Sequence, residues 1–401
     1  MRLLLVSQEV PPETGWGGIG TYVDVLSAAI ASKGVEVDVL SVVDGQPATR
    51  NESGGVTVHR QPLPRLRGAG RLPPEAWKRV WLPITVARLI RRLDLNPTVV
   101  ECPEWSAEGL ALALRRGVPL VVRLHSSARQ LFPYTNQGRE WRGLDGSLSA
   151  SLEELSARWA NVVVSTRSNL DEVAVQMRLD DRALHAIPYP VRLPPLEPMP
   201  NAGSPRVTFV GRLEPRKAPD VVLAAAPKVL AAVPDARFVF VGRDAIAPGT
   251  RPSTMWLQRE AERLGVAHAV ELTGQLDAEG VADQLRRATV CAFPSRWESF
   301  GNVVAEASAT GRPVVAAAIP PFRELVADGE TGRIVPGEDI DEWAAALIEL
   351  LSDHARAGAM GQAGAARVAG IADPGRVAEL ALAAHEHAIE RFRRGERAGM
   401  R

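Results

Sequence analysis

Short runs of Val, Ile and Leu alternate along the chain with longer segments in which apolar residues recur every three or four positions. This alternation is typical of βαβ units, in which buried parallel strands are joined by amphipathic helices. The apolar residues from Ile19 to Ile30 recur at helical spacing, which predicts a helix over 18–33. In the first half of the chain the pattern predicts strands at 2–7, 35–42, 55–60, 98–101, 119–124, 161–165 and 184–187.

A proline-rich stretch interrupts the alternation near the middle of the chain. Residues 188–205 contain seven prolines, a density that neither a helix nor a central strand accepts. After it, strands are predicted at 206–211, 237–242, 269–273, 289–293, 313–316 and 332–335, and helices at 217–233, 253–264, 278–287, 301–309 and 338–352. The segment 354–394 is rich in Ala and helical in pattern.

We therefore predict an α/β protein of two doubly wound, Rossmann-like domains that face each other across a cleft. Ligands of such sheets bind at the carboxyl ends of the strands. The predicted organisation is an N-terminal domain at 1–190, a Pro-rich linker at 191–205, a second domain at 206–375, and a C-terminal helix at 376–401 that packs back on the first domain.

Composition narrows the class of protein. The 401 residues are 46% hydrophobic, and 47 Lys and Arg balance 47 Asp and Glu, so disorder is not expected. The formal net charge of zero argues against a protein that coats nucleic acid, because such a protein needs an excess of Lys and Arg. The apolar start is too short for a signal peptide and no segment is long enough to span a membrane, so a cytoplasmic location is expected. Cys102 and Cys291 lie in apolar runs and are expected to be buried in strands.

A glycine cluster from Gly15 to Gly20 follows the first predicted strand and opens the first predicted helix. Glycine lets the backbone approach a phosphate closely, and a helix N-terminus supplies N–H groups and a positive dipole. The spacing also matches the dinucleotide fingerprint of NAD-dependent oxidoreductases. However, seven residues (8–14) separate the strand from the first glycine, whereas the fingerprint follows its strand directly. A purely structural loop is the other alternative.

Three cations, Arg212, Arg216 and Lys217, follow the first strand of the second domain, next to a predicted helix N-terminus. Such a turn suits a diphosphate, because Arg binds it bidentately and Lys acts as a point charge. The alternative is an exposed turn that carries cations for solubility.

Two glutamates accompany the fourth strand of the second domain. Glu298 lies in the loop after that strand, and Glu306 lies in the second turn of the helix that begins near Gly301. Val303, Val304 and Ala307 are expected to form the buried side of this helix, with Glu306 beside it. A carboxylate there needs hydrogen-bond donors, which a polyhydroxylated ligand provides, although a core cation is an alternative partner.

Together these segments resemble the retaining glycosyltransferases of family 4, the glycosyl transferases group 1, which have the GT-B fold of two facing Rossmann-like domains. The resemblance covers nearly the whole chain in order. It rests on GGIGTYV at 17–23, the His after strand 119–124, GRLEPRK at 211–217, the Glu298 and Glu306 pair, GRPVV at 311–315, and the segment from Glu324 to Gly332.

The resemblance implies a role for each matching residue toward a nucleoside-diphosphate sugar. It implies that Arg212 and Lys217 hold the diphosphate, that Glu306 binds the ribose, and that Glu298 contacts the sugar. Backbone N–H groups at Phe300, Gly301 and Asn302 are expected to face sugar and phosphate, and Gly17 and Gly18 to approach the diphosphate. His125 is expected to contact the transferred sugar, so the catalytic candidates are His125, Glu298, Arg212 and Lys217.

The resemblance also implies retention of anomeric configuration without a protein nucleophile, and no cofactor or metal. Asp339 and Asp341 spell Asp-x-Asp but precede a predicted helix, so they are expected to cap it. A GT-B epimerase or phosphorylase is the main alternative. A non-catalytic sugar-nucleotide-binding protein is disfavoured, because the cations, both glutamates and His125 are all present.

The acceptor, whether a small molecule, a growing glycan or a lipid-linked group, is expected at the first domain. Residues 60–92 contain nine Arg or Lys against Glu75 alone, which suits a solvated face, an anionic acceptor site or docking to an anionic membrane. Glu104 and Trp105 follow another strand and are further acceptor candidates. Two segments depart from the family pattern: Pro188-Tyr189-Pro190 stands where many relatives have Asn-Gly, and Arg243-Asp244 replaces a glycine-rich turn.

Overall fold

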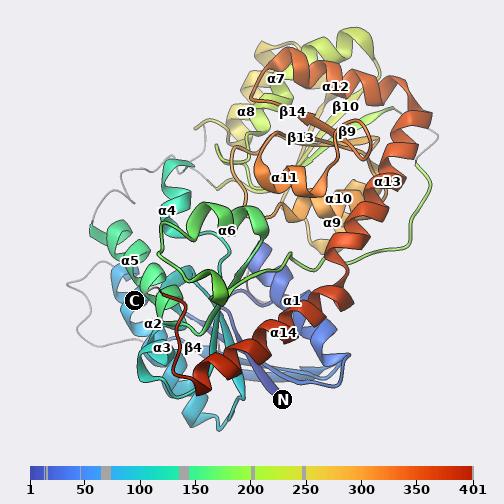
Figure 1. The fold of residues 1–401 in the computed structure, drawn as a ribbon. Helices are drawn as coiled ribbons and strands as arrows, with labels where there is room; N and C mark the ends of the chain where they lie inside the picture. The colour runs from blue at the N-terminus through green and yellow to red at the C-terminus, as the bar shows by residue number, and fades with distance from the viewer. Residues whose placement is uncertain are drawn as a thin grey trace. The chain divides into compact units, whose positions relative to one another are not determined.

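The protein is described by a computed structural model covering residues 1–12, 14, 17–45, 47–64, 74–134, 144–199, 204–245 and 250–399. The chain divides into two compact units (Figure 1). Unit 1 comprises Met1–Pro133, Gln137–Pro190 and Pro374–Arg401, and unit 2 comprises Tyr134–Asn136 and Val191–Asp373. The predicted linker 191–205 falls within unit 2 in this division, and the last helix belongs to unit 1.

Unit 1 is built on a sheet with the strand order β3-β4-β2-β1-β5-β6-β7-β8. All neighbours pair in parallel except β3 and β4, which are antiparallel. The strands are β1 (Arg2–Val6), β2 (Glu36–Val43), β3 (Thr49–Ser53), β4 (Val56–Pro62), β5 (Val99–Pro103), β6 (Leu120–Arg123), β7 (Val162–Ser165) and β8 (Leu184–Ala186). Parallel strands covered on both faces need apolar residues on both sides, which explains the near-continuous Val and Leu runs.

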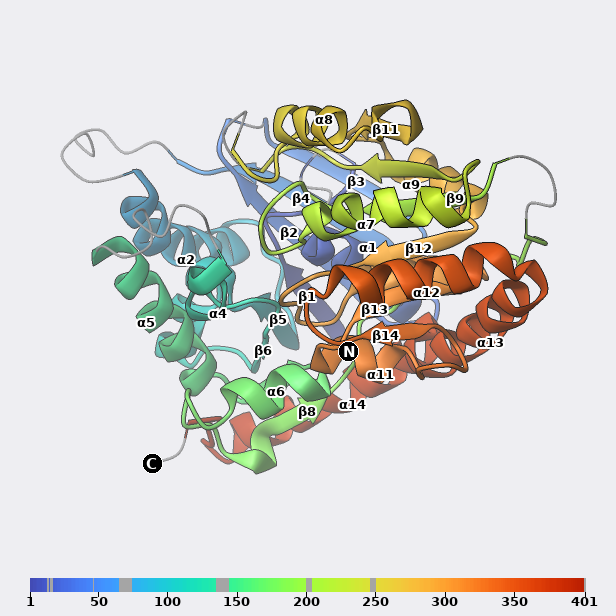
Figure 2. The same ribbon diagram turned by 90° about the horizontal axis from the view of Figure 1, so that it is seen from above.

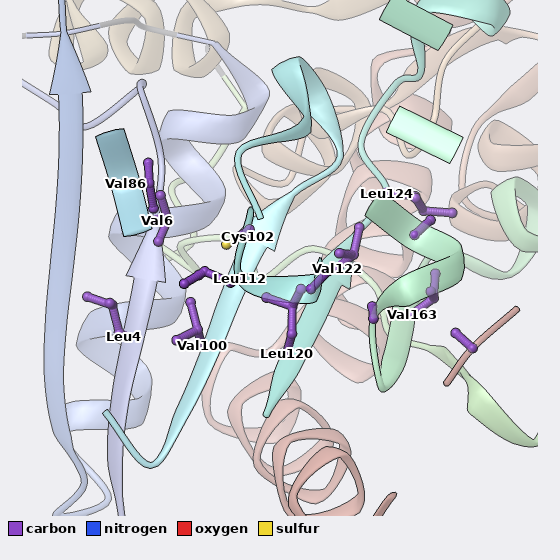
Figure 3. Packing of buried hydrophobic residues seen from close by; sticks show 14 of the residues in the cluster. Leu4, Val6, Val86, Val100, Cys102, Leu112, Leu120, Val122, Leu124 and Val163 are labelled. Carbon is purple, nitrogen blue, oxygen red and sulfur yellow. The ribbon is translucent and has the colours of Figure 1, made fainter. Parts of the chain in front are cut away.

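The helices of unit 1 are α1 (Gly18–Ala31), α2 (Pro74–Arg92), α3 (Leu110–Arg115), α4 (Ala128–Leu131), α5 (Leu144–Trp159), α6 (Arg167–Val173) and α14 (Pro374–Arg393), with 3-10 turns at Trp105–Ala107, Phe132–Tyr134 and Asp181–Ala183. One core cluster joins strand residues such as Leu4, Val100 and Val122 to Val86 of α2 and Leu112 of α3 (Figure 3). Cys102 belongs to this cluster and is fully buried, as expected. Helix α14 packs on α1 and on β5, β6 and β7.

Unit 2 has a fully parallel sheet with the order β11-β10-β9-β12-β13-β14. Helices α7 and α12 pack against each other (Figure 2). Helix α10 packs on β12, β13 and α13. The strands are β9 (Arg206–Val210), β10 (Arg237–Val241), β11 (Val270–Gly274), β12 (Val290–Phe293), β13 (Val314–Ala317) and β14 (Arg333–Val335). The helices are α7 (Pro219–Ala232), α8 (Thr254–Arg263), α9 (Ala278–Arg287), α10 (Asn302–Ala309), α11 (Pro320–Leu325), α12 (Ile340–Ser352) and α13 (His354–Ala372), with a 3-10 turn at Ala267–Ala269.

The structure confirms the α/β class and each strand predicted from the hydrophobic runs, with ends within two residues of the expected ones. Several of the described elements were not predicted, namely helices α2 to α6, strand β3 and helix α11. Strand β3 is exposed along its whole length and polar in sequence, so its formation depends on pairing with β4 rather than on burial. Helix α11 is only six residues long and begins with two prolines, which suit a first turn but resemble a loop. Within the described ranges, no helix has the length and apolarity needed to cross a bilayer.

A close helix contact in unit 2 gives a test of the packing. A Cβ atom added at Gly361 of α13 would lie 2.1 Å from the carbonyl oxygen of Gly311, so Gly361→Ala must displace backbone. We expect it to lower the free energy of unfolding by about 2 kcal/mol. Gly370→Ala is the matched control in the same helix, because among the described residues no atom outside its own stretch of helix backbone lies within 4 Å of its added Cβ. This control should be neutral or stabilising by up to about 1 kcal/mol. Urea unfolding of both variants checks this, and equal effects would contradict the contact.

Candidate functional site

Among the parallel strands of each sheet the order reverses at one place, between β1 and β5 in unit 1 and between β9 and β12 in unit 2. Doubly wound sheets bind ligands outside the carboxyl ends of the strands at such a switch point. In unit 2 these ends lead into the turn with Arg212 and Lys217 and into the loop with Glu298. The topology therefore brings two of the predicted motifs to one edge of one sheet.

The two motifs of unit 2 are joined through the carboxylate of Glu298. Its oxygens form ion pairs with Nζ of Lys217 and, at 3.0 Å, with Nη1 of Arg216, and Ser295 donates a hydrogen bond at 2.9 Å. The Glu298 side chain is only 9% exposed, and those of Lys217 and Arg216 are 14% and 9% exposed. Glu298 is thus the central counter-ion of a nearly buried cation pair.

Glu214 extends this cluster toward the surface. It accepts from Arg216 at 2.7 Å and pairs with Nη2 of Arg212 at 3.2 Å, and the Arg212 side chain is half exposed. Three cations against two carboxylates leave one positive charge in the cluster. Arg216 was one of the three cations of the predicted turn, but its pairing with Glu298 and the part of Glu214 in the cluster were not predicted, because alternating charges in a turn are also typical of a solvated surface.

The cluster sets the protonation of its members. Burial raises the pKa of Glu298, but the charges of Lys217 and Arg216 and the hydrogen bonds more than offset it and lower that pKa to about 2. Burial and the charge of Arg216 lower the pKa of Lys217. The charge of Glu298 acts in the opposite direction but does not offset them. Near neutral pH, Glu298 is therefore ionised and cannot act as a general acid.

Helix α10 begins next to this cluster through a residue that must be glycine. Gly301 is its N-cap, with a φ of 97°, and an added Cβ would lie 2.5 Å from the ring of Phe322. Asn302 is the first residue of the helix, and Phe300 before it is 2% exposed. Because Gly301 has no side chain, the capping residue does not cover the N-terminal backbone of α10. An anion site at a helix N-terminus requires such an open backbone.

Glu306 lies on the second turn of α10 and is half-buried, while Val304 and Ala307 beside it are fully buried. No described residue forms an ion pair or hydrogen bond with its carboxylate. Burial raises its pKa to about 7, although the charges of Arg192 and Lys217 oppose this. Among the described residues, Glu306 therefore does not pair with a core cation, which was the alternative. Val303, expected on the buried side, is only half-buried.

At the switch point of unit 1, Gly17 is the N-cap of α1 and Gly18 is its first residue. The carboxylate of Glu9 lies over this end of the helix: Oε2 accepts from the N–H of Gly20 at 3.2 Å and would be 2.5 Å from a Cβ at Gly17. A side-chain anion thus occupies the helix N-terminus where the sequence predicts a phosphate. Gly15 and Trp16 lie outside the described residues.

His125 follows β6 and is 3% exposed. Its backbone N–H donates to both carboxylate oxygens of Glu104 at 2.8 Å, and its Nδ1 lies 2.5 Å from the hydroxyl of Tyr189. Burial, followed by the charge of Arg123, lowers the pKa of His125 well below its usual value. The ring is therefore neutral at physiological pH.

Glu104 is fully buried, and its carboxylate accepts from the N–H groups of His125 and Ser126. Burial raises its pKa to about 7 against these hydrogen bonds. Trp105 beside it is half-buried in a 3-10 turn. The contacts of Glu104 in the structure are with backbone, and the acceptor role of both residues stays a prediction.

The basic stretch at 60–92 is only partly described. Arg65, Arg67 and Arg71 lie outside the described residues, and Arg60 and Arg79 are buried. Arg60 donates to the carbonyl oxygens of Val10 and Pro11, and Arg88 lies over the ring of Trp81 at 4.7 Å. The described part of this stretch is therefore not a uniformly solvated face, and membrane docking through it stays a prediction.

Asp339 caps α12, as predicted, by accepting from the N–H groups of Asp341 and Glu342. Across the part of the chain that the structure describes, no cluster of three or more His, Cys, Asp or Glu side chains is arranged to hold a metal ion.

The second half of the chain, residues 204–353, matches the sequence profile of glycosyl transferases group 1, and residues 17–190 match that of a glycosyl transferase 4-like domain. A D-inositol 3-phosphate glycosyltransferase of Geodermatophilus obscurus is 30% identical over 395 residues, which cover 93% of this chain and 85% of the relative. The chain belongs to the group 1 glycosyltransferases. It is therefore a glycosyltransferase, and the comparisons lend no support to an epimerase, a phosphorylase or an NAD-dependent oxidoreductase.

Solved structures share the fold of this glycosyltransferase. Sucrose-phosphate synthase from Thermosynechococcus elongatus is similar with a TM-score of 0.79 and 23% identity, covering 97% of this chain and 99% of that one. HepE of Anabaena in complex with UDP and glucose is similar with a TM-score of 0.69 and 18% identity, covering 95% and 98%. The fold is thus GT-B, as the resemblance implied.

The buried cation cluster of the transferase predicts a strong effect of removing its central charge. Glu298→Gln leaves Lys217 and Arg216 buried side by side without their shared counter-ion, which should lower the free energy of unfolding by about 3 kcal/mol. Glu338→Gln is the matched control, since Glu338 pairs with Arg296 but is 46% exposed and should cost less than about 1 kcal/mol. Urea titration of both variants measures the difference, and similar losses would show that Glu298 is not the central counter-ion.

Proposed function

We propose that this protein is a retaining, metal-independent glycosyltransferase that moves a sugar from a nucleoside-diphosphate sugar to a separate acceptor. The observation that carries the proposal is Glu306, a half-buried carboxylate without a partner among the described residues. It lies near enough to Lys217 for that charge to lower its pKa. An unpaired carboxylate beside a net-positive cluster suits a ligand with vicinal hydroxyls at one end and a diphosphate at the other.

In this proposal unit 2 binds the donor. Glu306 accepts from the ribose hydroxyls, and Arg212 and Lys217 hold the diphosphate together with the N-terminal N–H groups of α10 at Gly301 and Asn302. Arg212 suits this role because its side chain is half exposed and its ion pair with Glu214 is near the surface. Glu298 keeps Lys217 in place, contacts the sugar and leaves two of the three ammonium protons for the ligand.

The chemistry follows from where charge grows during transfer. As the glycosidic bond breaks, negative charge develops on the leaving diphosphate while the sugar becomes oxocarbenium-like. Fixed cations and a helix N-terminus aimed at that charge stabilise the transition state more than the ground state. These cations supply the positive charge that a metal ion supplies in metal-dependent transferases. Because Glu298 is ion-paired with two cations, we do not assign it as a nucleophile, and we assign no other carboxylate to that role. Attack of the acceptor on the same face of the sugar that the diphosphate leaves then retains the configuration.

The acceptor is proposed to bind at unit 1, where Glu104 and Trp105 follow the end of β5. The similar proteins named above use inositol 3-phosphate and make sucrose phosphate, according to their names, so a phosphorylated polyol or sugar is the first acceptor class to test. HepE holds UDP and glucose, which makes UDP-glucose the first donor to test in a thermal-shift screen of nucleotide sugars.

Replacing Lys217 tests the donor assignment. Lys217→Ala should lower the transfer rate by at least about a hundredfold, because one fixed charge on the leaving group is lost. It should leave the fold intact, since Arg216 still neutralises Glu298. Lys228→Ala, which removes a half-exposed lysine of α7, is the matched control. The readout is nucleoside diphosphate released only when acceptor is present. A folded Lys217→Ala protein with a near-normal rate would refute the assignment, and release that needs no acceptor would refute transfer.

The protonation of Glu306 predicts how donor affinity changes with pH. With a pKa of about 7 the carboxyl is mostly protonated at pH 6 and ionised at pH 8, and only the ionised form accepts from both ribose hydroxyls. The donor should therefore bind about tenfold more tightly at pH 8 than at pH 6. Calorimetry with an intact nucleotide sugar measures this, because its diphosphate does not titrate in that range. Glu306→Gln should bind weakly at both pH values, and an unchanged pH dependence in this variant would assign the effect to another group.

A further inference from the structure

Tyr189 stands in the segment Pro188-Tyr189-Pro190, where the chain departs from the Asn-Gly of many relatives. Its side chain is 4% exposed. Its hydroxyl lies 2.5 Å from Nδ1 of His125, and the two rings stack with centroids 5.4 Å apart and planes inclined by 19°. One tyrosine therefore contacts both a face and a nitrogen of the imidazole.

Tyr189 is itself held in place. The guanidinium of Arg123 lies 4.7 Å from the centroid of the Tyr189 ring and 4.5 Å from that of Tyr22, and its Nη2 donates to the carbonyl oxygen of Ile187 at 2.8 Å. The backbone of His125 is held separately by the carboxylate of Glu104. His125 is thus held by three contacts: at its backbone N–H, on one face of its ring and at Nδ1.

The chemistry of the pair decides which nitrogen carries the proton. A neutral imidazole has one N–H donor and one acceptor nitrogen. A phenol O–H is a stronger donor than the N–H of neutral imidazole, and an imidazole nitrogen is a stronger acceptor than a phenol oxygen. The cation over the Tyr189 ring strengthens its hydroxyl as a donor further. The hydroxyl therefore donates to Nδ1, and the ring proton is on Nε2.

We propose that Tyr189 is a positioning residue that fixes His125 as the Nε2–H tautomer, so that His125 donates a hydrogen bond to an oxygen of a bound sugar ligand and does not serve as a base. Nε2 has no hydrogen-bond partner among the described residues, which leaves this N–H to a ligand. The identity of that ligand rests on the proposed function, whereas the tautomer does not.

The tautomer is read directly from long-range ¹H–¹⁵N correlation spectra of ¹⁵N-histidine-labelled protein, with the His125 signals assigned by their loss in His125→Gln. We expect a protonated Nε2 and an unprotonated Nδ1 in the wild type. Tyr189→Phe keeps the ring but removes the donor, so the Nδ1 resonance should shift and the Nδ1–H form should appear. Tyr22→Phe is the matched control, because its ring also contacts His125 but its hydroxyl donates to Glu101. This variant should keep the wild-type tautomer.

A wild-type spectrum with a protonated Nδ1, or His125 signals unchanged by Tyr189→Phe, would overturn the proposal. With the donor found by the nucleotide-sugar screen, Tyr189→Phe should lower kcat/KM by about tenfold, as expected when an orienting hydrogen bond is lost. An unchanged kcat/KM together with an altered tautomer would overturn the catalytic part. If the wild type transfers no sugar from any donor, the proposed function fails, and the spectra still decide the role of Tyr189.

Discussion

Unit 2 depends on one buried carboxylate placed between two cations. Lys217 and Arg216 could not stay together at the end of β9 without a counter-ion, because two like charges with little access to water repel and are poorly solvated. Glu298, from the loop after β12, supplies that counter-ion. The same contacts connect the two loops across the switch point of the sheet. One interaction therefore stabilises both loops and leaves one positive charge of the cluster without a counter-ion inside it.

Unit 1 stabilises its buried polar groups with other kinds of contact. Its buried polar groups are held by backbone and by ring faces: Glu104 accepts from the backbone after β6, and Arg123 lies between the rings of Tyr22 and Tyr189. Glu101 receives hydrogen bonds from the Tyr22 hydroxyl and from Nε2 of His385, which is on α14. The result is a buried polar support around His125 that is held by hydrogen bonds and ring contacts, whereas unit 2 holds its buried cations with carboxylates.

Much of this architecture is predictable from the sequence, because buried parallel strands need unbroken apolar runs that leave a clear pattern. The cations of 211–217 and the two glutamates were also apparent as local motifs next to strand ends. The pairing of Glu298 with Lys217 was not, since it depends on β9 and β12 being neighbours in the sheet although they are far apart in the chain. The contacts of Tyr189 with His125 and of Glu101 with His385 were not predicted, for the same reason. The departure from the family pattern at 188–190 was the one signal that could have led to Tyr189.

Helix α14 has a consequence for the order in which the protein is made. Unit 1 contains the start of the chain, yet its sheet is covered by the final helix, whose His385 is fully buried against Glu101. Nearly all of unit 2 lies between these two pieces. During synthesis, all residues of unit 2 have been added before α14 leaves the ribosome, and until then β5, β6 and β7 of unit 1 lack the helix that packs on them. The domain that begins the sequence is therefore the last to be completed, and a fragment ending at residue 190 would lack part of its own core.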